Sequence, residues 1–263
     1  MKHAIKSLLG QSIFNSGLDA LLLHNAAVVV AFHRIDDTED PDGLTLGPDM
    51  FERYCRFFRR HFRVTSLGEL VDRLEQGRTV SRHLVLTFDD GYLDNYEHAA
   101  PVLERLGLPA TFFVVTQWIG TDVVAWWDRP LGAPHPWMTW EHVRSLYRRG
   151  FEIGAHTRTH ADLGRVSDAD AVDEIFGARR DLEMQLGAPV DLFAYPYGGR
   201  DNLSEPNRAL VRAAGYRCCC SGYGGDVASG TDPLQIRRVP ITPWYGPPQR
   251  FGFQVAVRRS VVS

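Results

Sequence analysis

Leu84-Val85-Leu86-Thr87-Phe88-Asp89-Asp90-Gly91 is an apolar run that ends in two acids and a glycine. Because the run is short and rich in β-branched and aromatic residues, it predicts a buried strand over 84–88. A second apolar run, 151–155, is followed in the same way by His156-Thr157-Arg158-Thr159-His160. Two carboxylates and two imidazoles are therefore expected directly after two buried strands.

Further strands and helices alternate along the chain. Besides 84–88 and 151–155, strands are expected at 27–32, 111–115, 192–195, 216–220 and 236–241, and helices at 49–61, 67–75, 96–106, 140–149, 168–186 and 206–214. This alternation is typical of parallel βα units, so we predict an α/β fold. The segment 118–140 lacks periodicity but is rich in tryptophan and proline, which indicates a long ordered insertion. A chain of 263 residues, 44% of them hydrophobic, fits one large domain.

The N-terminal 25 residues are expected to precede this domain, which spans 26–263. Apolar residues recur at near-helical spacing between Ile5 and Leu23, which indicates an amphipathic helix. Packing of this helix on the domain is favoured, and contact with a membrane surface is the alternative. Polar residues interrupt the segment, so we expect no cleavable signal peptide, and no apolar run is long enough to cross a bilayer.

The charge and the cysteine content of the chain bear on its possible partners and its cellular compartment. The formal net charge is −3 and charged residues make up 23% of the chain, so no nucleic-acid partner is expected. Cys55 and the run Cys218-Cys219-Cys220 fit neither a disulfide framework nor paired zinc knuckles. On a strand, the three neighbours would alternate between its faces as small apolar residues. This usage indicates a reducing compartment, so we predict a cytoplasmic protein, at the inner membrane face if its N-terminal helix contacts lipid.

Polar side chains follow several of the predicted strands. The carboxyl ends of parallel strands meet on one rim, and His33, Asp89, Asp90, His156 and Tyr197 all come after strands. Alone, an acidic pair before glycine could be a turn and each histidine could be structural. A helical turn after His156 would place the histidine four residues later on the same side. Two imidazoles and one carboxylate can hold a divalent metal with open positions, which leaves the second acid to act as a base.

These motifs resemble those of the polysaccharide deacetylases, carbohydrate esterase family 4, also known as the NodB-homology domain. The first family motif is similar to 87–91, the second to 156–160, and the third to Ala194-Tyr195-Pro196-Tyr197-Gly198. With Phe193 before it, this third motif resembles the family branch that carries Phe-Ala-Tyr-Pro. The resemblance covers about 27–241 and implies a distorted (β/α) barrel with fewer than eight strands.

The resemblance also implies an activity, the metal-dependent removal of N-acetyl groups from a polysaccharide, an oligosaccharide or a glycan precursor. Asp89 would be the general base, and Asp90, His156 and His160 would bind the metal. Zn²⁺ is expected first, with Co²⁺, Ni²⁺ and Mn²⁺ as alternatives. Such an ion polarises the amide carbonyl and makes water more acidic. The backbone N–H of Tyr197 would stabilise the oxyanion.

Two positions depart from the family pattern. Ala194 stands where the third motif usually has an arginine that orients the base, and the family's late histidine is absent near 234–237. His33 is the candidate for the general acid because it ends the first strand and histidine titrates near neutral pH; a structural role is the alternative. Four arginines could orient the base, and the sequence does not choose among them: Arg34, Arg158, Arg200 and Arg238.

Carbohydrate contacts are expected from Pro196 and Tyr197 of the third motif and from Trp127 of the insertion. Aromatic rings pack well on the apolar faces of sugars. Trp126 and Trp127 are adjacent, so we expect at most one of them to face a groove. The alternative is that these tryptophans pack the insertion onto the barrel; Asp128 is close enough in sequence to reach the site.

Two other functions remain open. The same barrel resembles hydrolases of other non-peptide C–N bonds, including deformylases, imidases and allantoinases. A non-catalytic carbohydrate-binding protein could also keep the barrel. With no signal peptide expected, the substrate would be a cytoplasmic lipid-linked or nucleotide-linked sugar, or one reached from the inner membrane surface.

Overall fold

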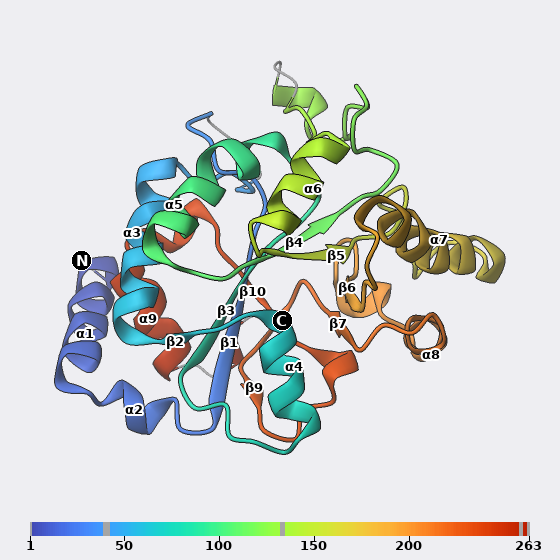
Figure 1. Cartoon of the computed structure of the whole chain (residues 1–263). Coiled ribbons are helices and arrows are strands. Elements are labelled where there is room, and N and C mark those ends of the chain that lie inside the picture. The colour runs from blue at the N-terminus through green and yellow to red at the C-terminus, as the bar shows by residue number, and fades with distance from the viewer. Residues whose placement is uncertain (1, 39–42, 132–134, 258–259, 262–263) are drawn as a thin grey trace.

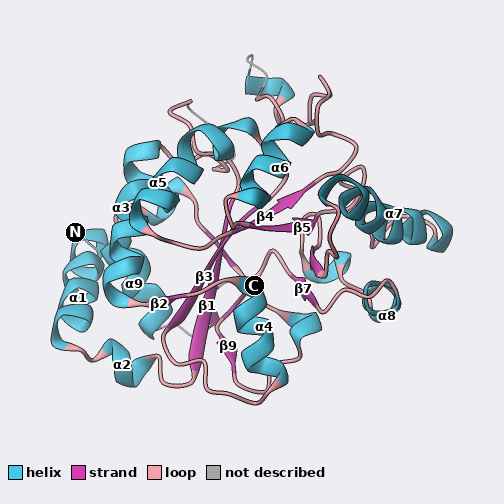
Figure 2. Ribbon diagram, in the orientation of Figure 1, coloured by secondary structure: helices cyan, strands magenta, loops and turns pink. Residues whose placement is uncertain are grey.

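A curled sheet of parallel strands forms the centre of the molecule, and helices cover its outside (Figure 1, Figure 2). The computed structural model describes residues 2–38, 43–131, 135–257 and 260–261. The strands of the main sheet are β1 (Ala26–Phe32), β2 (Arg63–Val64), β3 (His83–Phe88), β4 (Thr111–Val114), β5 (Glu152–Ala155), β6 (Leu192–Ala194), β7 (Cys218–Cys220), β9 (Val227–Ala228) and β10 (Val239–Pro240). A small antiparallel pair joins β8 (Gly224–Gly225) and β11 (Ser260–Val261).

The helices lie between and around these strands. They are α1 (Lys2–Ser16), α2 (Asp19–Leu22), α3 (Pro48–His61), α4 (Leu67–Glu75), α5 (Ala100–Leu106), α6 (Trp140–Arg148), α7 (Asp168–Leu186), α8 (Glu205–Ala213) and α9 (Pro248–Val257). A π-helical turn, Asn95–Ala99, leads into α5. Local signals set several ends: the Ser66 and Ser167 side chains cap α4 and α7, each such cap contributing about 1 kcal/mol. Gly107 ends α5 in the left-handed conformation, as the sequence predicts.

The strands of the main sheet curl into an incomplete barrel. Neighbours run β10-β1-β3-β4-β5-β6-β7, all in parallel, while β9 adds an antiparallel pair at the start of β1. A bridge between Cys220 and Ile236 connects β7 to the segment that enters β10. Seven strands in the described chain therefore form the curled path. The predicted distorted (β/α) barrel with fewer than eight strands is confirmed.

Alternate residues of each strand face the inside of the barrel. On β3, Val85 belongs to the inner apolar cluster, and the same face continues through Thr87 to Asp89. The inner cluster also holds Cys218 and Cys220 of β7, while Cys219 packs in the outer core, so the predicted alternation of the cysteines is confirmed. Leucines of α4 fill the amino end of the barrel. The carboxyl end is left for polar groups.

Most predicted elements occur within a few residues of their expected bounds, and the differences have local causes. Two-residue strands such as β2 and β9 are too short to show a period. α9 lay outside the predicted elements. The N-terminal segment is two helices, because Gly17 takes φ 78° and ends the first. The prediction of a single helix there is wrong.

The N-terminal helix α1 packs on α9. Phe14 is buried in the outer core, and Gly10 lies so close to α9 that a Cβ there would meet the Gln249 carbonyl oxygen. Packing on the body, the favoured expectation, is therefore seen. Among the described helices, none is both long and apolar enough to span a membrane.

Candidate active site

Asp90, His156 and His160 converge on one point at the carboxyl end of the barrel. The Asp90 Oδ1 atom lies 3.4 Å from His156 Nε2 and 3.3 Å from His160 Nε2, and all three side chains are buried. Burial raises the pKa of Asp90, but its contacts with the two imidazoles lower it well below the ordinary value. A carboxylate oxygen and two imidazole nitrogens within 4.8 Å of one another fit a divalent metal ion.

Atoms around this triad are arranged as a metal would require. The Asp90 Oδ1 atom and the His160 Nδ1 atom are buried, and neither has a hydrogen-bond partner among the described residues. His156 Nδ1 lies 2.8 Å from the carbonyl oxygen of Ala194, so its N–H can donate there while Nε2 faces the triad. The ring of His160 stacks on Trp118 at 5.4 Å and contacts Trp127 at 4.7 Å. The residues present therefore fit the predicted metal site.

The segment that carries both histidines is a loop, so the predicted helical turn is wrong. Thr157 and His160 have φ of 62° and 60°, which a helix does not allow. Glu174 of α7 holds the loop, because its carboxylate accepts from the amides of Arg158 (2.8 Å) and Thr159 (2.9 Å) and from the Thr159 hydroxyl (2.6 Å). The left-handed backbone, and not helical periodicity, brings the imidazoles together.

Asp89 is held by an arginine from the far end of the chain. Arg238 donates to both of its carboxylate oxygens, Nη1 to Oδ1 at 2.7 Å and Nη2 to Oδ2 at 2.8 Å. The guanidinium is itself fixed by the Ser221 carbonyl (2.6 Å) and the Thr87 hydroxyl (3.1 Å). Burial raises the pKa of Asp89, and the charge and hydrogen bonds of Arg238 outweigh it, so the pKa is lowered. Of the four candidate arginines, Arg238 is the one that contacts Asp89.

The other three arginines have different partners. Arg34 is ion-paired with Asp128, and Arg158 with Asp173 and Asp181. Arg200 lies over the ring of Tyr223. The position of Arg238 explains why it is the arginine that contacts Asp89. Ile236, Arg238 and Pro240 are alternate residues of the segment that runs through β10, and their side chains face the inside of the barrel.

His33 lies beside Asp89 at the end of β1. Its Nε2 atom is 4.0 Å from Asp89 Oδ2, and its side chain is 22% exposed, so it can reach both the acid and a ligand. The backbone here is fixed by the segment that follows β3: Asn95 Nδ2 donates to the His33 carbonyl oxygen at 2.7 Å, and Asp94 accepts from the Ile35 amide at 3.0 Å. The predicted position of His33 on the rim is thus observed.

These groups line a cavity of about 420 Å³ that opens at the rim. Trp126 and Tyr197 form its exposed edge, with 62% and 47% of their surfaces accessible, and Trp126 Nε1 lies 3.4 Å from the Tyr197 hydroxyl. Tyr197 has φ 60°, and its amide donates no hydrogen bond within the described residues. That N–H is available to an anionic atom in the cavity.

The remaining predicted contacts are only partly observed. Both Trp126 and Trp127 line the cavity, so the expectation that at most one would do so is wrong. Trp127 is 8% exposed and donates to the Tyr92 hydroxyl at 2.8 Å, because the insertion turns its ring inward onto His160. The sequence pattern did not single out Trp126 as the exposed ring.

Pro196 and Asp128 do not reach the cavity. Pro196 is buried, and it is not among the described residues that line the cavity, because it forms the turn in which Gly198 donates to its carbonyl oxygen. Its predicted contact with substrate is therefore not supported by the structure. Asp128 pairs with Arg34 and accepts from the Tyr92 hydroxyl at 2.8 Å, a structural role that holds the insertion on the barrel.

Comparisons with known proteins agree with this geometry. Residues 76–219 match the family model described as polysaccharide deacetylase. A putative polysaccharide deacetylase from Bacillus subtilis is 25% identical over 171 residues, which is 65% of this chain and 56% of that relative. A poly-β-1,6-N-acetyl-D-glucosamine N-deacetylase from Staphylococcus aureus is 20% identical over 83% of this chain and 79% of its own length.

Solved structures show the same fold. A Streptococcus pyogenes deacetylase in complex with acetate has a TM-score of 0.72 at 21% identity, with 86% of this chain and 96% of that one covered. A structure of IcaB from Ammonifex degensii has a TM-score of 0.73 at 22% identity, with 88% and 97% covered. The family model spans more than half of the chain and includes both motifs that supply the metal triad and Asp89. The chain belongs to the polysaccharide deacetylase family.

Proposed function

We propose that this protein is a metal-dependent N-deacetylase that hydrolyses the acetamido groups of an N-acetylglucosamine polymer or its precursor. The observation that carries the proposal is that two adjacent acids have different partners. Asp90 faces two imidazoles, and Asp89 is held by Arg238 in the same cavity. The S. aureus relative, named for poly-β-1,6-N-acetyl-D-glucosamine, supports the class of substrate. The branch with a Phe-Ala-Tyr-Pro third motif is part of this proposal.

Each residue has a task in this reaction. A divalent ion held by Asp90, His156 and His160, which we propose is Zn²⁺, would supply Lewis-acid activation of the amide and of water. Asp89 takes the proton of the attacking water, since Arg238 keeps its carboxylate ionised and fixed in direction. The amide of Tyr197 donates to the developing oxyanion. These groups are preorganised because both carboxylates and both imidazoles are buried.

The departing amine needs a proton, and we propose that His33 gives it. Its imidazole is half-buried on the side of Asp89 that faces the cavity, and no lysine lines this cavity among the described residues. A protonated imidazole can donate to the amine as the C–N bond breaks. The amino sugar and acetate are then the products. Trp126 and Tyr197, at the exposed edge, are the proposed platform for the sugar ring.

Acetate release tests the proposed reaction. Purified protein loaded with Zn²⁺ should release acetate from β-1,6-linked N-acetylglucosamine oligomers, and His156→Gln should lose most of its bound metal and its activity together, because the triad loses one of its three ligands. Metal content is measured by mass spectrometry and acetate by an enzyme-coupled assay. His24→Gln, an exposed histidine at the opposite end of β1, is the matched control and should keep both.

Two results would contradict the proposal. Full activity after complete removal of metal would exclude the metal-dependent reaction. Release of formate or opening of a cyclic imide, with no acetate from any N-acetylated sugar, would place the enzyme among hydrolases of other C–N bonds. Binding of the oligomers with no turnover at any metal loading would make it a carbohydrate-binding protein.

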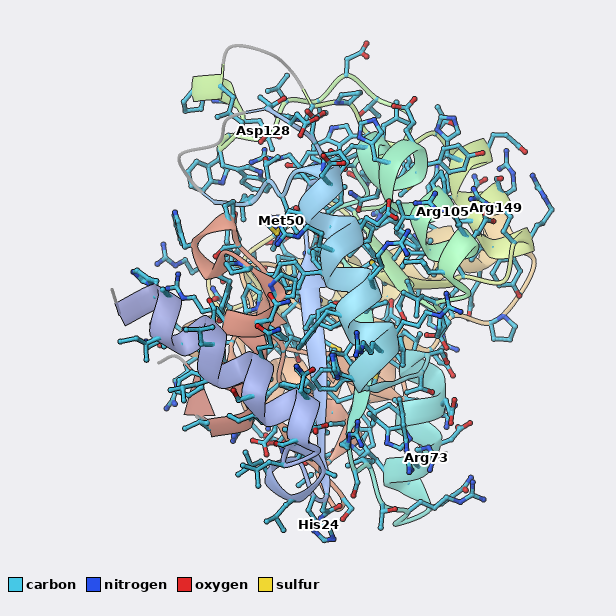
Figure 3. All side chains as sticks on the ribbon, turned by 90° about the vertical axis from the view of Figure 1, so that its left-hand side faces the viewer. His24, Met50, Arg73, Arg105, Asp128 and Arg149 are labelled. Atoms are coloured by element: carbon cyan, nitrogen blue, oxygen red, sulfur yellow. The ribbon has the colours of Figure 1, made fainter. Side chains whose placement is uncertain are left out.

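We further propose that α1 and α2 contact the cytoplasmic face of a membrane. Figure 3 views the molecule from the side on which α1 lies. Five large apolar side chains of this N-terminal segment are exposed although Phe14 anchors α1 on the body: Ile5, Leu8, Leu9, Leu18 and Leu21. Lys6 on the same helix adds positive charge, which suits an anionic lipid surface.

Vesicle co-sedimentation tests this contact. Wild-type protein should sediment with vesicles of phosphatidylethanolamine and phosphatidylglycerol, and Leu8→Glu/Leu21→Glu should reduce binding by about tenfold or more, since each buried leucine contributes about 1.5–3 kcal/mol. Met184→Glu on α7 is the matched control because Met184 is 72% exposed, like Leu21 at 71%. Equal sedimentation of the double variant and the wild type would argue against the contact, and fractionation of cells would test the compartment.

A further inference from the structure

A second group of metal-binding side chains lies on the rim outside the active-site triad. Asp36 follows β1, Asp94 follows β3, and His135 comes from the insertion before α6. One possible ligand atom from each of the three residues lies within 4.8 Å of the other two. Segments that are distant in the sequence thus bring two carboxylates and one imidazole to one point.

Hydrogen bonds from neighbouring residues hold both carboxylates in place. Asp36 Oδ1 accepts from the amide and the hydroxyl of Thr38, each at 2.9 Å. Asp94 Oδ1 accepts from the Ile35 amide at 3.0 Å and from the side chain of Asn95. These hydrogen bonds all end on an Oδ1 atom. The two side chains are therefore held in place with an oxygen each still able to bind a cation.

The electrostatics of the cluster favour a cation. Asp94 is 7% exposed and His135 is 8% exposed, so the cluster has little water to screen its charges. Burial, with a smaller contribution from the charge of Asp36, raises the pKa of Asp94 to about 6. The neighbouring guanidinium of Arg34 is ion-paired with Asp128. Two carboxylates that repel each other in a mostly buried place are stabilised when a divalent ion binds between them.

We propose that Asp36, Asp94 and His135 bind a second divalent cation, separate from the ion of the Asp90 triad. Carboxylates together with an imidazole suit Zn²⁺ or Mn²⁺ better than Mg²⁺, which prefers oxygen ligands and water. The ion would tie together the loop after β1, the turn after β3 and the insertion. His33 is on the first of these segments, three residues before Asp36, so the site would stabilise the rim on which the proposed acid lies. The proposal does not depend on which reaction the enzyme catalyses.

Metal stoichiometry of the full chain distinguishes the two sites. Wild-type protein, stripped of metal and titrated with Zn²⁺ in a calorimeter, is expected to bind two equivalents. Asp90→Ala/His160→Ala removes the triad and should still bind one equivalent. Asp36→Asn/His135→Gln should also bind one, and the variant with all four changes should bind none. Repeating the titration with Mn²⁺ shows which ion the rim site prefers.

Controls separate loss of a ligand from loss of the fold. His24→Gln, at the end of the molecule opposite Asp128 in Figure 3, should bind two equivalents. Circular dichroism checks each variant, and Asp36→Asn alone is a milder change because Asp36 is only half-buried. The second site is supported if Zn²⁺ raises the Tm of the triad variant and Asp36→Asn weakens that effect. It is overturned if the triad variant binds no metal, or if Asp36→Asn/His135→Gln still binds two equivalents.

Discussion

Asp89→Asn is expected to lower kcat/KM for acetate release by about 10²–10⁴-fold, the range that a general base contributes. The amide cannot accept the proton of the attacking water, whereas the carboxylate can. Metal content should stay near that of the wild type, because Asp90, His156 and His160 form the triad without Asp89. Acetate release and bound metal are measured on the same preparation.

The comparison with Asp90→Asn makes this prediction specific. Both variants replace one of two adjacent buried carboxylates by its isosteric amide, so the changes are matched in size and charge. Asp90→Asn should lose metal affinity and regain part of its activity at high metal concentration. Asp89→Asn should gain nothing from added metal. If Asp89→Asn keeps full activity, or if both variants respond to metal in the same way, the division of labour between the acids is wrong.

The resemblance to the deacetylase family implies this division, and the geometry of the strand end is consistent with it. Residues that alternate along β3 put Val85, Thr87 and Asp89 on the inner face, and a left-handed Asp90 at the strand end turns the next carboxylate toward the histidines. Apolar runs and caps also predict β1, α3, α4 and α7 with ends that differ by at most one residue. These features depend on residues close together in the sequence.

Features that depend on distant contacts were not predictable in the same way. The loop 156–160 owes its shape to Glu174, which lies on another element and has no sequence signal that links it to the histidines. Which of Trp126 and Trp127 is exposed depends on how the insertion, held through Asp128 and Arg34, lies on the barrel. In an irregular segment, adjacent side chains do not alternate between a buried and an exposed side. Sequence periodicity therefore could not predict which tryptophan is exposed.

Arg238 is the main example of such a contact. It is separated from Asp89 by 149 residues, and four arginines were equally acceptable from composition and position in the chain. The alternation through Ile236, Arg238 and Pro240 is a signal that could have found it, once β10 is known to pair with β1. Arg238 reaches Asp89 from the segment that enters β10.

Arg238→Met is expected to lower the free energy of unfolding by about 3–5 kcal/mol, because it leaves Asp89 as a buried charge without its partner. Arg238 lowers the pKa of Asp89, so without it burial should raise that pKa. The acidic limb of the pH profile of kcat/KM should then move to higher pH, and part of the lost activity should return as the pH rises. Urea unfolding and the pH profile are the two measurements.

The double variant Asp89→Asn/Arg238→Met separates stability from catalysis. With both charges removed, no uncompensated ion is buried, so the unfolding free energy should recover most of what Arg238→Met alone loses. Activity should stay at the level of Asp89→Asn at every pH, since no base remains to be titrated. Arg238→Lys keeps the charge but not the two parallel hydrogen bonds, and should lie between wild type and Arg238→Met in both measurements. If Arg238→Met loses stability but its acidic limb does not move, then Arg238 supports the fold and does not tune the base.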